Sequence, residues 1–145
     1  MSVVVDASVV VHWLIPGTFT HSATRLLHGE ERLLAPDLLV AEVGNAVWKY
    51  HRQRLVSREE ADTAIGMLDV APIALQASTQ LITDAFQIAA DLDRSVYDSL
   101  YLALAFVANA PFVTADRKLR NAVAGTPIGE HVVWIEDWPE PLEKG

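Results

Sequence analysis

Four carboxylates in this sequence of 145 residues stand where acids are unusual, and they are the side chains best suited to chemistry. Asp6 follows three valines, and Asp116 closes the short apolar run 112–115, so both are expected at the carboxyl end of a strand. Glu42 is the only charged residue between positions 38 and 48. Asp98 opens a largely apolar segment with helical spacing. Acids in such places bind hard cations or take part in hydrolytic chemistry.

Each of these acids also has a purely structural interpretation. Asp6 and Asp116 each precede a new segment, and aspartate is a common N-cap. Glu42 needs no special role if it lies on an exposed edge of its helix. Ser95, three residues before Asp98, would form a capping box with it. The four acids together point to one site more strongly than any of them does alone.

A site made of four carboxylates requires a cation, because the negative charges repel one another. All-oxygen sites suit Mg²⁺ or Mn²⁺ rather than zinc. An ion of this kind beside a cleft favours phosphate chemistry, since it orients water and offsets charge on phosphoryl oxygens. Asn45 lies one helical turn after Glu42, and Ser8 and Thr114 lie beside two of the acids in sequence. We therefore expect Ser8, Asn45 and Thr114 to support the four predicted metal-binding and catalytic residues, which are Asp6, Glu42, Asp98 and Asp116.

Cysteine and histidine offer no alternative site. The chain has no cysteine, which excludes a disulfide framework, a thiolate zinc site and a cysteine nucleophile. The five histidines show no ligand spacing such as His-x-x-x-His, and we interpret them as surface or packing residues: His12, His21, His28, His51 and His131.

Short apolar runs alternate along the chain with longer segments of helical period. The expected strands are 3–5, 33–34, 72–75, 112–114 and 132–135. The expected helices are 20–28, 36–54, 57–68, 78–92, 96–109 and 117–123. Pro36 is expected in the first turn of its helix, and Ser57 with Glu60 in a capping box. This alternation predicts an α/β fold with a mainly parallel sheet of four to five short strands, covered on both faces.

The composition indicates one globular domain spanning residues 1–145. Hydrophobic residues make up 51% of the chain and charged residues 21%, which excludes a disordered protein. No basic leader or long apolar stretch indicates export or membrane insertion, so a cytoplasmic protein is expected. The net charge of −8, to which an acidic tail from about residue 136 contributes, argues weakly against nucleic acid as a partner.

The stretches around the four acids read VVDAS, APDLLVAEVGNA, YDSLYLALA and FVTADRKL. In this order and at this spacing they resemble the motifs of PIN-domain ribonucleases, in particular the VapC-type toxins of toxin–antitoxin pairs. The resemblance implies a three-layer α/β/α domain, four acids that bind Mg²⁺ or Mn²⁺, and endonucleolytic cleavage of RNA. It also implies a homodimer and a VapB-type antitoxin that blocks the acidic cleft. The chain departs from many members in having Lys118, rather than another acid, two residues after Asp116.

Two local groups of basic residues reconcile an RNA substrate with the negative net charge. One group follows Glu42 on the same expected helix, and the other follows Asp116. We expect RNA contacts from both groups, although a solvated helix face is the alternative explanation for each: Lys49, Arg52 and Arg54 in the first, Arg117 and Lys118 in the second.

Two other functions remain open at this point. An aspartate at the end of a first strand can be the nucleophile of a phosphatase. The residue two positions after Asp6 is Ser8 rather than a second aspartate, which disfavours that reaction. A non-catalytic RNA-docking or structural domain is the other alternative, but a protein that only binds a polyanion gains nothing from a negative cleft.

Overall fold

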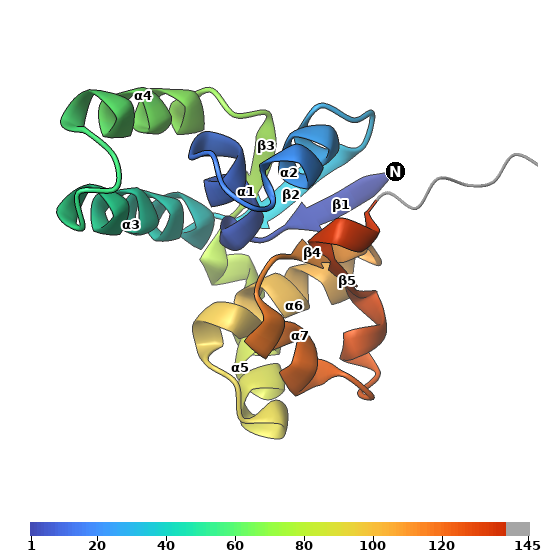
Figure 1. The fold of residues 1–145 in the computed structure, drawn as a ribbon. Helices are drawn as coiled ribbons and strands as arrows, with labels where there is room; N and C mark the ends of the chain where they lie inside the picture. The colour runs from blue at the N-terminus through green and yellow to red at the C-terminus, as the bar shows by residue number, and fades with distance from the viewer. Residues whose placement is uncertain (139–145) are drawn as a thin grey trace, which may run out of the picture.

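The computed structural model describes residues 1–138 and shows a five-stranded sheet between two layers of helices (Figure 1). Every neighbouring pair of strands in this sheet is parallel. In the spatial order β3-β2-β1-β4-β5, the strands are β1 (Ser2–Val5), β2 (Arg32–Pro36), β3 (Ile73–Gln76), β4 (Phe112–Thr114) and β5 (Val132–Trp134). The expected α/β fold with a parallel sheet is confirmed.

The helices divide between the two faces of the sheet. Figure 1 shows α1 to α4 on one side and α5 to α7 on the other. The first layer consists of α1 (Ala7–Leu14), α2 (Thr20–Leu27), α3 (Leu38–Arg52) and α4 (Arg58–Asp69). The second consists of α5 (Ser78–Leu92), α6 (Val96–Ala108) and α7 (Arg117–Val123). Two 3-10 helices, η1 (Ile128–His131) and η2 (Ile135–Asp137), flank β5. The domain therefore has three layers, α/β/α.

The central strands are buried because both of their faces are covered. Val3, Val4 and Val5 of β1 have no exposed surface, and neither do Phe112 and Val113 of β4. A continuous β-branched run suits a strand that has no solvated face. Each buried valine contributes about 1.5–3 kcal/mol of hydrophobic stabilisation. Strands β1 and β4 thus form a rigid base for the residues that follow them.

The register of β1 and β4 brings their carboxyl ends to the same edge of the sheet. Val5 is paired with Val113, and the N–H of Asp6 donates to the carbonyl of Val113 at 3.0 Å. Asp6 and Thr114 consequently emerge side by side. In open parallel sheets this edge is where ligands bind.

The sequence prediction missed α1 entirely. The sequence of α1, ASVVVHWL, is rich in β-branched and aromatic residues of modest helix propensity, and no side chain caps its start. Burial stabilises it instead, because five of its residues are in the core: Ala7, Val9, Val10, Val11 and Leu14.

The expected position of Pro36 in a helix is also wrong. Pro36 is the last residue of β2 and is in register with Gln76 of β3, while α3 begins at Leu38. The fixed φ of proline suits extended backbone at a strand end as well as a first helical turn, so the sequence does not discriminate between them. The expected capping box of α4 is present, with both bonds between Ser57 and Glu60 at 3.0 Å.

Among residues 1–138, no helix combines the length and the apolar composition that a membrane crossing requires. The first residues of the expected acidic tail, Glu136 and Asp137, belong to η2. The rest of that tail, residues 139–145, lies outside the part of the chain that the structure describes.

Candidate metal-binding active site

Asp6 is a buried carboxylate that begins α1 without capping it. It is 8% exposed and occupies the N-cap position of α1, but its side chain makes no capping hydrogen bond. Its Oδ2 accepts hydrogen bonds from Ser8 Oγ at 2.8 Å and Thr114 Oγ1 at 2.7 Å. Burial raises the pKa of Asp6 from 3.8 to about 6, the two hydroxyl donors oppose this rise, and the charges of Glu42 and Asp116 add to it. A carboxylate perturbed in this way is typical of functional sites.

Ser8 and Thr114 bond to the backbone that follows β4 as well as to the carboxylate of Asp6. The Asp116 N–H donates to Thr114 Oγ1 at 3.0 Å, and the Ala115 N–H donates to Ser8 Oγ at 3.0 Å. Each hydroxyl therefore donates to Asp6 and accepts from the backbone after β4. Both residues lie where the sequence placed them, beside the acids.

Asp116 caps α7 and also lies near Asp6. Its Oδ1 accepts from the N–H groups of Lys118 at 2.9 Å and Leu119 at 3.2 Å. The structural interpretation of this acid as an N-cap is therefore confirmed. The capping bonds use only Oδ1, and the negative charge of Asp116 contributes to the raised pKa of Asp6. Capping consequently leaves the other oxygen available for a second partner.

Glu42 is half-buried on α3 and is held by a tyrosine of α6. Tyr101 Oη donates to Glu42 Oε1 at 2.7 Å. Burial raises the pKa of Glu42, the Tyr101 hydrogen bond lowers it, and the charge of Asp98 raises it. Glu42 is therefore not a solvated acid on an exposed helix edge.

Tyr101 is a residue of the candidate site that the sequence analysis missed. It is 2% exposed and stacks on Phe112 of β4, with 5.5 Å between ring centroids. Burial raises the pKa of Tyr101, and the nearby charges of Asp6 and Glu42 raise it further, so the phenol stays a protonated donor. The available signal was a tyrosine inside the apolar run of α6, because a buried hydroxyl needs a partner.

Asp98 occupies the third position of α6 and faces an arginine. Ser95 Oγ accepts from the Asp98 N–H at 3.1 Å, which is one half of the expected capping box. The Asp98 carboxylate does not complete the box. Its Oδ2 accepts instead from Arg94 Nη2 at 3.0 Å. The Asp98 carboxylate therefore bonds to Arg94 instead of to the backbone N–H of Ser95.

The negative charges of the four acids act on one another in the order Asp116, Asp6, Glu42 and Asp98, and these four residues are called the row below. The charges of Asp116 and Glu42 raise the pKa of Asp6, and the charge of Asp98 raises the pKa of Glu42. Within residues 1–138, Asp6 and Glu42 form no ion pair, and no three acidic or histidine side chains make a ready-made metal site. The donor set nevertheless fits a hard divalent cation, because it consists of carboxylate oxygens and, within residues 1–138, only Asp98 of the four acids forms an ion pair.

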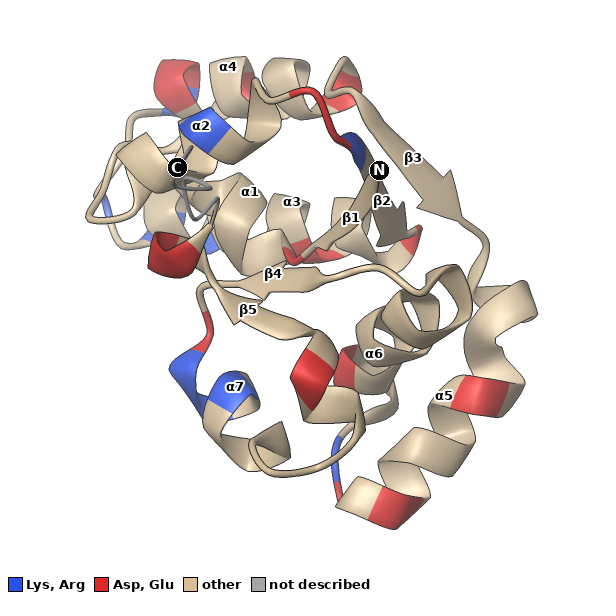
Figure 2. Cartoon of the chain, turned by 90° about the vertical axis from the view of Figure 1, so that its right-hand side faces the viewer, with Lys and Arg blue, Asp and Glu red and all other residues tan. Residues whose placement is uncertain are grey.

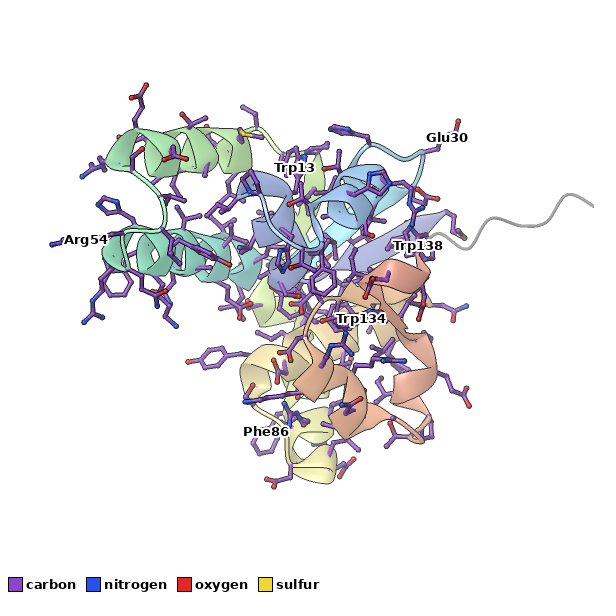
Figure 3. All side chains as sticks on the ribbon, in the orientation of Figure 1. Trp13, Glu30, Arg54, Phe86, Trp134 and Trp138 are labelled. Carbon is purple, nitrogen blue, oxygen red and sulfur yellow. The ribbon has the colours of Figure 1, made fainter. Side chains whose placement is uncertain are left out.

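The predicted supporting and basic residues differ in their distance from this row. Asn45 is exposed on α3, one turn beyond Glu42. Lys49, Arg52 and Arg54 lie still further along, beginning about 10 Å from Glu42 at the usual helical rise of about 1.5 Å per residue. Figure 3 shows Arg54 at the far end of α3.

The second basic group directly follows Asp116. Figure 2 shows basic residues gathered at the start of α7, after the acidic position that follows β4. Here Arg117 and Lys118 are exposed, and the guanidinium carbon of Arg117 lies 4.6 Å from the ring centroid of buried Trp134. Trp134 thus orients Arg117 through a cation–π contact that the sequence analysis missed.

Residues 3–124 match the PIN domain family, and this range contains all four acids. Ribonuclease VapC3 of Pyrobaculum aerophilum is 31% identical to this chain over 121 residues, which cover 82% of this chain and 92% of that protein. Ribonuclease VapC1 of Mycobacterium tuberculosis is 34% identical over 123 residues, covering 82% of this chain and 89% of that protein. The chain therefore belongs to the PIN domain family. Within that family it is similar to the VapC ribonucleases.

Solved structures share the fold. PAE2754 from Pyrobaculum aerophilum superposes with a TM-score of 0.66 and 22% identity, covering 94% of this chain and 90% of that chain. A toxin–antitoxin complex from Klebsiella pneumoniae gives a TM-score of 0.63 and 18% identity, covering 91% of this chain and 96% of the other. The expected three-layer PIN-like architecture is confirmed.

The raised pKa of Asp6 predicts a pH-dependent stability of the metal-free protein. Between about pH 4 and 6 the folded state keeps a proton that the unfolded chain has released, so the free energy of unfolding falls as pH rises through this range. At neutral pH the buried charge should cost roughly 2–3 kcal/mol. Asp6→Asn should therefore be more stable than the wild type at about pH 7.5 and show a flatter pH profile.

Urea unfolding in the presence of EDTA, across this pH range, measures the effect. Asp84→Asn, at an exposed position of α5, is the matched control and should follow the wild-type profile. A wild-type stability that rises steadily from about pH 4 to 7 would contradict the assignment.

Removing the Tyr101 hydroxyl should lower the free energy of unfolding, because Glu42 loses its hydrogen-bond donor. Tyr101→Phe keeps the stacking on Phe112 but leaves Glu42 Oε1 without its donor, which should cost about 1–2 kcal/mol at neutral pH. Tyr97→Phe, on an exposed tyrosine of the same helix, should have almost no effect. Chemical denaturation of both variants measures the difference, and equal stabilities would show that the Tyr101–Glu42 bond has no net effect.

Proposed function

We propose that this protein is a metal-dependent endoribonuclease and the toxin of a toxin–antitoxin pair. The observation that carries the proposal is the row of four carboxylates at the carboxyl edge of the sheet. Within residues 1–138, the side-chain donors to buried Asp6 and half-buried Glu42 are all hydroxyl groups. Membership of the PIN domain family and similarity to VapC ribonucleases support the same reaction and favour it over an aspartate-based phosphatase.

The four acids, Asp6, Glu42, Asp98 and Asp116, are the proposed ligands of Mg²⁺, with Mn²⁺ as an alternative. Such an ion, when bound, activates water and offsets negative charge that develops on the scissile phosphate. The chain's own bonds orient the ligands. Ser8 and Thr114 donate to Oδ2 of Asp6, and Tyr101 donates to Oε1 of Glu42. Among residues 1–138 no side chain donates to the other oxygen of either carboxylate, which leaves these two oxygens for the proposed ion. One carboxylate of the row orients the attacking water.

RNA would reach this row from the side of α7. Arg117 and Lys118 are exposed next to Asp116, and the Trp134 ring fixes the direction of Arg117. A phosphate contact here offsets the repulsion between the acids and the substrate. The more distant group consists of Lys49 and Arg52 on α3 and Arg54 just after it. This group, with Asn45 nearer to Glu42, would contact nucleotides that flank the cleavage site.

The acidic edge also suits an inhibitory partner. A basic segment of a VapB-type antitoxin would neutralise the carboxylates and exclude both the metal and RNA from them. The similar ribonucleases carry the VapC name, and a solved neighbour is described as a toxin–antitoxin complex. We propose the cytoplasm as the place of action, because RNA is the substrate.

A second copy of the chain is the proposed partner for another surface. A hollow of about 270 Å³ between α3, α4 and β3 is lined mainly by apolar side chains. Val40, Ile65 and Leu75 are each more than two-fifths exposed there, and β3 is the edge strand of the sheet. Exposed apolar surface of this kind marks interaction sites.

Loss of a single acid should abolish RNA cleavage without unfolding the protein. Asp6→Asn and Asp98→Asn should each lower the cleavage rate by at least about a hundredfold, a typical effect of losing an electrostatic catalytic group. EDTA should abolish wild-type cleavage, and added Mg²⁺ or Mn²⁺ should restore it. Asp84→Asn serves as the control that keeps full activity. Undiminished cleavage by folded Asp6→Asn or Asp98→Asn would remove the assignment.

The dimer proposal predicts a change in mass when the apolar hollow receives a charge. Leu75→Glu should shift the protein from dimer to monomer in light scattering, because an unpaired buried charge destabilises an interface. Thr83→Glu adds the same charge at an exposed polar position of α5 and should remain dimeric. A monomeric wild type at micromolar concentration would contradict the dimer.

A further inference from the structure

Arg94 is the one arginine or lysine that forms an ion pair with an acid of the row within residues 1–138. Its Nη2 donates to Asp98 Oδ2 at 3.0 Å, and the two side chains are 27% and 29% exposed. Neither the family resemblance nor the reaction proposed above gives this arginine a role. Its position nevertheless connects it to the metal-binding row through Asp98.

The turn between α5 and α6 fixes the position of Arg94. Asp93 adopts a left-handed conformation with φ of 52°, which ends α5, and the Arg94 N–H closes the turn on the Ala89 carbonyl at 3.2 Å. Ser95 then caps α6. Arg94 therefore lies just before the N-cap of α6, and Asp98 is in the first turn of that helix. The turn places the two side chains 3.0 Å apart.

The ion pair replaces a hydrogen bond that Asp98 would otherwise make. In a complete capping box the third residue of the helix returns a bond to the backbone of the N-cap residue. The Ser57 box of α4 does so, whereas Asp98 turns to Arg94 instead. The carboxylate is thus kept off the helix end and accessible at the row.

The contact is of a kind that a stronger ligand displaces. Only one N–H of Arg94 bonds to Asp98, whereas strong arginine–carboxylate pairs are bidentate. Arg94 Nε is buried and has no hydrogen-bond partner within residues 1–138. A partly exposed, single-bonded pair at this spacing contributes little stability, so a divalent cation at Asp98 competes with it easily.

We propose that Arg94 is a positioning residue that acts as a built-in counter-ion of Asp98 and thereby lowers the affinity of the site for its divalent cation. In the metal-free protein Arg94 neutralises the charge of Asp98, at one end of the row, and fixes the direction of its carboxylate. A divalent cation that binds Asp98 would have to displace the guanidinium and stay close to its positive charge, and both requirements would lower the affinity. This inference rests on the metal-dependent function proposed above.

The test is titration calorimetry of Mn²⁺ into the full-length protein at low ionic strength. Arg94→Gln should bind Mn²⁺ about three- to tenfold more tightly than the wild type, the size expected when one positive charge near a divalent ion is removed. Arg94→Ala is a second neutral variant with the same expected effect. Arg94→Lys keeps the charge and should stay within about twofold of the wild type.

Arg58→Gln is the matched control. Arg58 pairs with Asp62 at the same spacing and the same 3.0 Å distance, but this pair lies on the exposed surface of α4. Its loss should leave Mn²⁺ affinity unchanged. A purely structural role for Arg94 would lower the melting temperature of the metal-free protein without tightening Mn²⁺ binding.

The possible failures are distinguishable. If neither neutral variant binds Mn²⁺ more tightly than the wild type, or if Arg94→Lys tightens binding as much as Arg94→Gln, the counter-ion role is wrong while the metal site stands. If the wild type itself binds no Mn²⁺ at millimolar concentration, the metal-dependent function and this inference fall together.

Discussion

Repulsion between carboxylates at one edge of a parallel sheet is the constraint on which the site depends. Burial of β1 and β4 brings Asp6 and Asp116 to that edge, and α3 and α6 add Glu42 and Asp98. The fold forms this arrangement although burial raises the pKa of Asp6, and the charges of Glu42 and Asp116 raise it further. A hydrophobic core that holds the strands rigidly is what keeps the acids from moving apart.

The site supports its acids in two different ways. Ser8, Thr114 and Tyr101 hold the two central carboxylates with uncharged donors, which orient the acids and leave their negative charge in place. At the ends of the row, backbone N–H groups hold Asp116 and Arg94 holds Asp98. Within residues 1–138, the two central carboxylates therefore have no cationic partner, whereas Asp98 at one end of the row is paired with Arg94.

Much of the fold could be predicted because local patterns agree with the tertiary structure. Helices 78–92 and 117–123 have the expected bounds, and the five strands occupy the expected places. Helix α1 could not be predicted, since its sequence has modest helix propensity and packing stabilises it. The capping box at Ser95 is half-formed for a similar reason, because a neighbouring side chain competes for Asp98.

The sequence by itself determined which side chains are available: four acids in apolar or strand-end settings, their order along the chain, and the hydroxyls beside Asp6 and Asp116. Only the tertiary structure decided which partners they meet, and it joined Tyr101 to Glu42 across 59 positions and Thr114 to Asp6 across 108. Hydrophobic periodicity specifies which face of an element is buried. It carries no information on which polar atom meets another across the core, because that depends on how separate elements pack.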